Sequence, residues 1–151
     1  MNLIENKERI FSQVAQAMET ANRTDQVNVI AVTKYVGIDQ AKALVDTGVR
    51  HIGENRVDKF LEKYQALKDE GLTWHLIGSL QRRKVKEVIN YVDYFHALDS
   101  MKLAQEIQKR ASHPIKCFIQ VNISGEESKH GFAPEELDAL LPEMENLDNL
   151  Q

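Results

Sequence analysis

The sequence contains little of several residue types, and each shortage excludes a class of protein. A single cysteine, Cys117, means that no disulfide can form within the chain, which suits a reducing compartment such as the cytoplasm. Only three prolines and seven glycines occur among 151 residues, and 42% of the residues are hydrophobic, as in ordinary globular proteins. No apolar run approaches the ~20 residues of a transmembrane helix. The composition therefore predicts one globular domain of the cytoplasm that can build a hydrophobic core.

An excess of positive charge is also missing. The formal net charge is −4 and the pI is about 5.7, which argues against a general affinity for nucleic acids or for membrane surfaces. The first ten residues, MNLIENKERI, carry charges and no apolar segment, so we expect no signal peptide. The lone thiol lies in the apolar stretch IKCFIQV, where a small buried hydrophobic residue is expected rather than a nucleophile.

The sequence does contain a repeated pattern of strand and helix. Stretches typical of strands begin about 22 residues apart, near Asn28, Arg50, Thr73, Tyr94 and Ile115. Each is followed by apolar residues at helical spacing, and one more amphipathic helix precedes the first strand. The helices are expected over residues 2–22, 40–47, 56–68, 82–90 and 100–110, with a last one beginning at Pro134.

Capping and breaking residues set the expected ends of these helices. Asp39 is expected to cap the helix over 40–47, and either Asp99 or Ser100 the helix that ends at residue 110. Pro142 is expected to end the last helix, because proline lacks an N–H group and its ring clashes with the preceding turn.

Five strand–helix units predict a parallel α/β sheet, because parallel strands need crossover helices. Two architectures fit the pattern. A doubly wound sheet of flavodoxin-like order suits 151 residues, whereas a (β/α)₈ barrel normally needs 200 residues or more. In the barrel, a sixth strand would start at Leu150. Both architectures place functional groups at the carboxyl ends of the strands.

The first strand delivers a lysine to that edge. In NVIAVTKYVG, residues 28–37, an apolar run that is expected to be buried on both faces stops at Thr33 and Lys34. A lysine that faces an apolar pocket loses hydration of its charged form, which makes its free amine available for Schiff-base chemistry. On the residues alone, a solvated loop lysine is the commoner case.

Two further features invite functional hypotheses. His51, His75 and His96 fall one per strand, and three histidines can hold zinc, but no tight H-x-H spacing is present. We therefore expect packing or hydrogen-bonding histidines and no metal. The segment QVNISGEESKHGF, residues 120–132, is longer than the other connections and mixes glycine with charges, which is typical of functional loops.

Five segments together carry a resemblance to a known family. They are AVTK (31–34), GENRV (53–57), WHLIGSLQ (74–81), HALDS (96–100) and QVNISGEESKHGF (120–132). In order and spacing they resemble the motifs of the pyridoxal phosphate homeostasis protein family, which is similar to the N-terminal barrel of alanine racemase. The resemblance runs from about Val27 to Leu137.

The resemblance implies a fold and a cofactor. The fold is a (β/α)₈ TIM-type barrel that forms one domain over residues 1–151 and stops after five βα units. The cofactor is pyridoxal 5′-phosphate (PLP), held as a Schiff base by the matching lysine, Lys34. Asn55 would lie beside the pyridine ring, and Lys129 matches a second family lysine that handles the cofactor. His75 and Asn122, in the same motifs, are further candidate cofactor-binding residues.

The resemblance also implies a function without catalysis: a protein that binds PLP, buffers it and delivers it to PLP-dependent enzymes. An amino-acid racemase is the alternative, but it needs a second base from an added domain, for which this chain has no room. A receiver-like doubly wound module would need an acidic cluster where Thr33 and Lys34 stand.

In the family, groups in the last third of the barrel grip the phosphate, and nothing in these residues matches them. We therefore expect a shortened chain, with the phosphate-binding residues beyond Gln151. The full-length protein is expected to be a monomer, whereas the unpaired strand edges of five units alone favour self-association.

Overall fold

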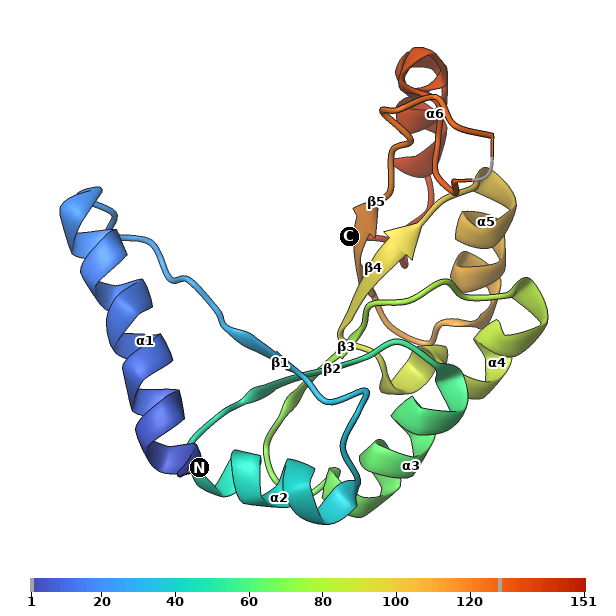
Figure 1. Cartoon of the computed structure of the whole chain (residues 1–151). Helices are drawn as coiled ribbons and strands as arrows, with labels where there is room; N and C mark the ends of the chain where they lie inside the picture. The colour runs from blue at the N-terminus through green and yellow to red at the C-terminus, as the bar shows by residue number, and fades with distance from the viewer. Residues whose placement is uncertain (1, 128) are drawn as a thin grey trace.

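The computed structural model describes residues 2–127 and 129–151, and its centre is one parallel sheet of five strands (Figure 1). All four strand pairs are parallel, with Gly53 of the second strand opposite both Val32 and His75 of its neighbours. The strands are β1 (Ile30–Val32), β2 (His51–Glu54), β3 (Thr73–Leu76), β4 (Tyr94–Leu98) and β5 (Lys116–Ile119).

The order of the strands decides between the two predicted architectures. The sheet runs β1-β2-β3-β4-β5, so each strand lies beside the one before it in the sequence. A flavodoxin-like sheet has the order 2-1-3-4-5 and carries helices on both faces. Since right-handed crossovers between sequential neighbours all fall on the same side, this order gives a curved sheet with helices on one face, as in a barrel. The barrel-type prediction is therefore confirmed.

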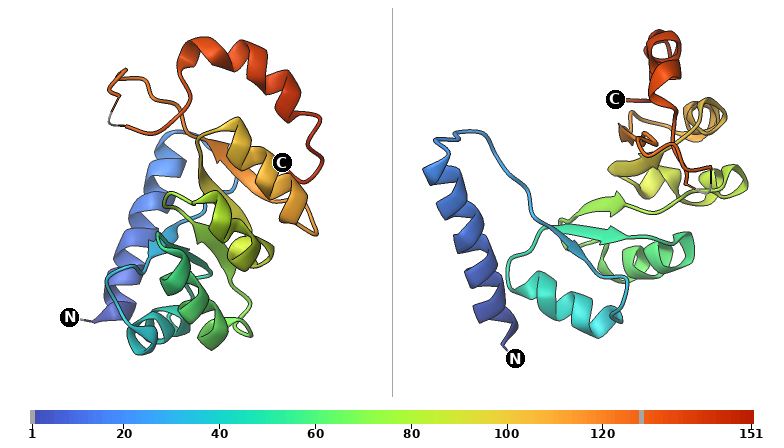
Figure 2. Two further views of the ribbon diagram at one scale, coloured as in Figure 1. Left: turned by 90° about the vertical axis from the view of Figure 1, so that its right-hand side faces the viewer. Right: turned by 45° about the horizontal axis from the view of Figure 1, so that its top comes forward.

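Helices alternate with the strands as predicted (Figures 1 and 2). The amphipathic segment before β1 forms a long helix beside α2, and short 3₁₀ turns flank α4. The helices are α1 (Leu3–Thr20), α2 (Ile38–Asp46), α3 (Val57–Leu67), α4 (Val85–Val88), α5 (Met101–Arg110) and α6 (Leu137–Met144), with 3₁₀ turns at Arg82–Lys84, Ile89–Tyr91 and Pro134–Glu136.

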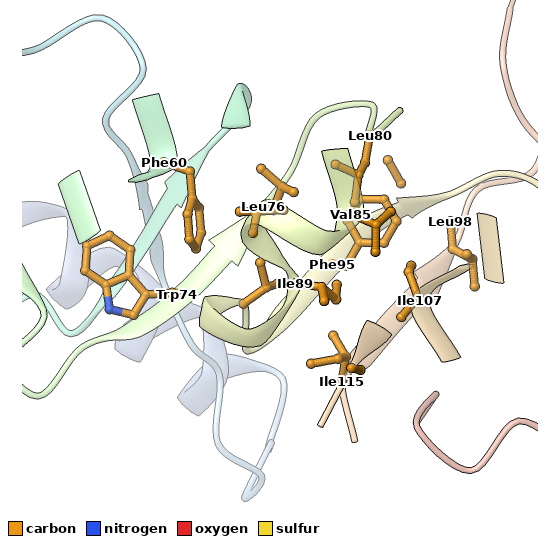
Figure 3. Close-up of a cluster of buried hydrophobic side chains, with 14 of the residues drawn as sticks. Phe60, Trp74, Leu76, Leu80, Val85, Ile89, Phe95, Leu98, Ile107 and Ile115 are labelled. Atoms are coloured by element: carbon orange, nitrogen blue, oxygen red, sulfur yellow. The ribbon is translucent and has the colours of Figure 1, made fainter. Parts of the chain in front are cut away.

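The hydrophobic core lies between the sheet and the helices α2–α5 (Figure 3). Alternate residues of the strands point into it, because successive side chains of a strand face opposite ways. Phe60 of α3 meets Trp74 of β3 edge to face, with ring centroids 5.6 Å apart. Val85, Val88 and Ile89 are all fully buried.

The other face of the sheet, which we call the open face, is only partly covered. It carries Val32, His75, Tyr94, His96 and Phe118, and the side chains of Val32 and Phe118 are 50% and 53% exposed. The prediction that the first strand is buried on both faces is therefore wrong. The physical reason is that no other element among the described residues covers this face of β1.

An isolated parallel bridge forms where the sequence predicts a sixth strand. Leu150 forms a parallel bridge with Ile115, and the amide of Gln151 donates to the carbonyl of Ile115 at 2.9 Å. The carbonyl of Gln151 in turn accepts from the amide of Cys117. The sheet therefore continues past β5 in sequence order.

Several local predictions are wrong. Asp39 lies inside α2, because the extended backbone of Gly37 takes the N-cap position. Pro142 does not end α6, which continues to Met144 because the amide of Glu145 can still donate to the carbonyl of Leu141. The predicted helix before the first strand is present as α1; its Phe11 packs against the core, although no described residue of α1 is fully buried. Among residues 2–127 and 129–151, no helix is long and apolar enough to cross a membrane.

Candidate functional site

Lys34 lies at the carboxyl end of β1, as predicted. Strand β1 ends at Val32, and a tight turn follows, in which the amide of Val36 donates to the carbonyl of Thr33 at 3.2 Å. The side chain of Lys34 is exposed, and its Nζ lies 5.0 Å from the centroid of the Tyr35 ring. Among residues 2–127 and 129–151, no acidic side chain forms an ion pair with this amine, which is open to a ligand approaching this edge of the sheet.

A buried polar cluster lies directly behind Lys34. Lys63 of α3 donates from Nζ to Glu54 Oε2 at 2.8 Å and to the carbonyl of Thr33 at 2.9 Å. The hydroxyl of Thr33 donates to the same carboxylate oxygen of Glu54. All three side chains are almost fully buried, with Thr33 1%, Glu54 0% and Lys63 2% exposed. The last residue before Lys34 is therefore held by an ion pair inside the protein.

Asn55 follows β2 and lines a cavity of about 370 Å³ at the carboxyl edge of the sheet. Ser79, Gln81 and Lys84 line the same cavity, which combines amide, hydroxyl and ammonium groups. Gly78 is required here, because a Cβ atom at that position would lie 2.1 Å from the carbonyl oxygen of Asn55. Lys34 does not line this cavity.

The three strand histidines form a row across the open face rather than a cluster around one point. His75 Nε2 lies 3.0 Å from His51 Nδ1, and His75 Nδ1 lies 2.9 Å from His96 Nε2. Because the two ring nitrogens of His75 contact His51 on one side and His96 on the other, the three rings cannot coordinate one metal ion together. Within the part of the chain that the structure describes, no group of histidine, cysteine and acidic residues has the geometry of a metal site.

Burial keeps these imidazoles neutral. Desolvation, followed by the charges of His96 and His51, lowers the pKa of His75 to about 4. Burial also lowers the pKa of His51 and of His96, although Asp93 opposes this shift at His51. Burial raises the pKa of the Cys117 thiol to about 12, and this half-buried side chain packs against the core.

The loop after β5 is organised by Asn122. Its Nδ2 donates to the carbonyl of Glu126 at 2.7 Å, and its Oδ1 accepts from the hydroxyl of Ser124 and the amide of Gly125. The predicted ligand-binding amide is thus engaged by its own loop. Lys129 is exposed and lines a cavity of about 270 Å³ together with Asn122.

The sequence-predicted residues occupy two places. Lys34, Asn55, Asn122 and Lys129 all follow the carboxyl ends of strands, whereas His75 lies within β3 on the open face. Among the described residues, no hydrogen bond links Lys34 to any of the other four. Their roles toward a cofactor therefore stay predictions.

Sequence reasoning missed Glu54 and Lys63. A signal for the second was present: Lys63 stands three residues after Phe60 and four before Leu67, in the middle of the buried stripe of α3. A charge at such a position is retained only with a buried partner.

Comparison with known proteins agrees with this geometry. The family model of the alanine racemase N-terminal domain matches residues 6–151. A pyridoxal phosphate homeostasis protein of Aquifex aeolicus is 39% identical over 155 residues, which cover 100% of this chain and 68% of that protein. One from Pseudomonas aeruginosa is 32% identical, over 99% of this chain and 66% of its own length.

Solved structures show the same fold. PipY of Synechococcus elongatus, solved with PLP bound, matches with a TM-score of 0.83 and 28% identity over 99% of this chain and 67% of its own. An unknown protein from Bifidobacterium adolescentis matches with a TM-score of 0.86 and 32% identity, over 99% of this chain and 66% of its own. The chain spans about two thirds of the length of these relatives. The chain therefore belongs to the alanine racemase N-terminal domain family and, within it, to the pyridoxal phosphate homeostasis proteins.

Proposed function

We propose that this chain binds PLP through Lys34 and takes part in PLP homeostasis. One observation carries the proposal: the exposed amine of Lys34 stands at the carboxyl end of the first strand of a parallel sheet, at the edge where ligands bind in such folds. Bound PLP would supply an aldehyde with which a primary amine condenses, losing one water and forming a Schiff base.

The surrounding residues fit such a group. The cavity beside Asn55 offers amide and hydroxyl groups to a polar ring. The loop held by Asn122 presents Lys129 at the same edge of the sheet. The relatives named pyridoxal phosphate homeostasis proteins, and the PLP-bound structure of PipY, support the choice of this cofactor.

We further propose a role without catalysis, in which PLP is stored and passed to PLP-dependent enzymes. The names of the curated relatives support homeostasis rather than conversion of a substrate. The similarity to alanine racemases, at 19% identity, concerns the fold alone. An assay for interconversion of L- and D-alanine should show no turnover with PLP present, and a rate above the protein-free control would contradict this role.

The covalent bond tests the proposal directly. Reduction with borohydride after incubation with PLP should place the label on Lys34 in peptide mass maps. Lys34→Ala should abolish the label yet change the free energy of unfolding by less than about 0.5 kcal/mol, because the side chain is exposed. Lys129→Ala is the matched control and should keep the label. A label on Lys129 with Lys34 unmodified would refute the assignment.

A further inference from the structure

We infer that Glu54 and Lys63 are positioning residues for Lys34. They hydrogen-bond Thr33 from the interior of the protein and so fix the position and orientation of the backbone at Lys34, where the chain leaves the sheet. The inference rests on the proposed function of Lys34. It assigns a role to two buried charges that contact neither the open face nor the carboxyl-edge cavity.

Every polar group of Thr33 is engaged. Its amide donates to the carbonyl of Gly53 at 3.0 Å, which extends the pairing of β1 with β2. Its carbonyl accepts from Lys63 Nζ, and its hydroxyl donates to Glu54. The backbone is therefore anchored to β2 and to α3 at the residue that precedes the reactive lysine.

The carbonyl contact acts on Lys34 through covalent geometry. The carbonyl of Thr33 and the amide nitrogen of Lys34 belong to one peptide unit, which is planar and rigid. Holding the oxygen with an ammonium group fixes that plane, and the plane determines where the Cα atom of Lys34 lies. The long side chain of Lys34 then moves about a fixed origin rather than about a mobile turn.

Stability alone does not explain the ion pair. Replacing a buried ion pair by apolar residues of similar volume is often neutral or stabilising, because desolvation of both charges offsets their attraction. The other buried residues of α3, Phe60 and Leu67, are apolar, so an apolar residue would suit position 63. Moreover, Glu54 Oε1 is buried and has no hydrogen-bond partner among the described residues, which adds to the cost of the pair. An apolar pair at positions 54 and 63 would lose the hydrogen bonds that Glu54 and Lys63 make with Thr33.

Removal of both charges separates positioning from packing. The variant Glu54→Leu/Lys63→Met has an apolar pair in place of the ion pair and leaves no unpaired charge. We expect its urea unfolding midpoint to be equal to or above that of Lys63→Met alone. We expect it to form the bond between Lys34 and PLP at least about tenfold more slowly than the parent, since a displacement of 1 Å can reduce rates about 100-fold. Recovery of the parent rate along with stability would overturn the inference.

Three single variants complete the test. Glu54→Gln keeps a side-chain oxygen and leaves the contact of Lys63 with the carbonyl of Thr33, so its rate should stay within about threefold of the parent. If only charge balance matters, Glu54→Gln and Lys63→Met should be slowed equally, because each leaves one buried charge unpaired; that result would refute positioning. Lys59→Met removes an exposed lysine of the same helix and should change nothing.

Amide hydrogen exchange tests the inference without PLP. In the double variant, exchange at Thr33 and Val36 should be at least tenfold faster than in the parent, with α5 unaffected. Absence of a bond between the parent and PLP would refute the proposed function alone, and the exchange result would still decide on positioning. Unchanged exchange at both amides would refute positioning, even if Lys34 binds PLP.

Discussion

His75 is a titratable side chain with almost no access to water, since only 3% of it is exposed. It stacks on the ring of Tyr94, with centroids 4.6 Å apart, and lies between two other histidines. Its pKa of about 4 follows from burial first and from these neighbouring histidines second. A proton on His75 would therefore place an unsolvated positive charge in the middle of the sheet.

This residue should make stability depend on pH. The pKa of His75 is lower in the folded state, about 4, than in the unfolded chain, where it is about 6.5, so the unfolded state binds more protons between these values. Stability is thus complete above about pH 6.5 and falls as the pH decreases, by up to about 3 kcal/mol at pH 4. Urea unfolding at pH 7 and pH 4 should show a smaller loss for His75→Gln than for the parent, and equal losses would exclude His75 as the cause.

No metal is expected at the histidine row. Elemental analysis after dialysis should find no stoichiometric zinc. The ring nitrogens of His51 and His96 are hydrogen-bonded to different nitrogens of His75, so these nitrogens are not arranged around one metal ion. About one equivalent of zinc per chain would contradict this expectation.

At the scale of the helices, α5 shows how far a sequence can specify an element. Its sequence left two N-cap candidates, Asp99 and Ser100, because both residue types favour that position. In the structure Ser100 takes it, and its hydroxyl accepts from the amide of Leu103 at 3.1 Å. Local chemistry predicted a cap, whereas the residue that fills it depends on where β4 ends.

The cap gives a paired prediction. Ser100→Ala should lower the free energy of unfolding by about 1 kcal/mol, since the amide of Leu103 loses its partner. Asp99→Ala, one residue earlier, should cost less because among the described residues its carboxylate accepts from no helix amide; it lies 4.0 Å from His130 Nδ1. Thermal or urea unfolding of the two variants measures the difference, and a larger loss for Asp99→Ala would reverse the assignment.

At the scale of the whole chain, most of the fold could be predicted from the repeated spacing of strands and helices. The five strand starts and the bridge at Leu150 could be predicted because a 22-residue repeat recurs whatever the packing. The contacts of the site could not be predicted in this way. That Lys63 reaches past Glu54 to the carbonyl of Thr33 depends on how α3 packs over two neighbouring strands, a relation that no sequence spacing contains.

The exposed apolar side chains of the open face should make this 151-residue chain associate with itself. Val32 and Phe118 are half-exposed on a sheet, and such surfaces favour contact with another molecule. Sedimentation velocity should show a rising average mass with concentration, and Phe118→Thr, which keeps a strand-forming residue, should shift this rise to higher concentration. A mass that stays monomeric for the parent would contradict the prediction.

The row of histidines has a direction. A neutral imidazole has one donor nitrogen and one acceptor nitrogen, so if His51 donates to His75, then His75 must donate to His96. The opposite sense requires all three rings to change tautomer together. Whatever fixes the proton on His51, at the start of β2, therefore also fixes it on His96 in β4, and the ¹⁵N shifts of the three rings should report a single shared state.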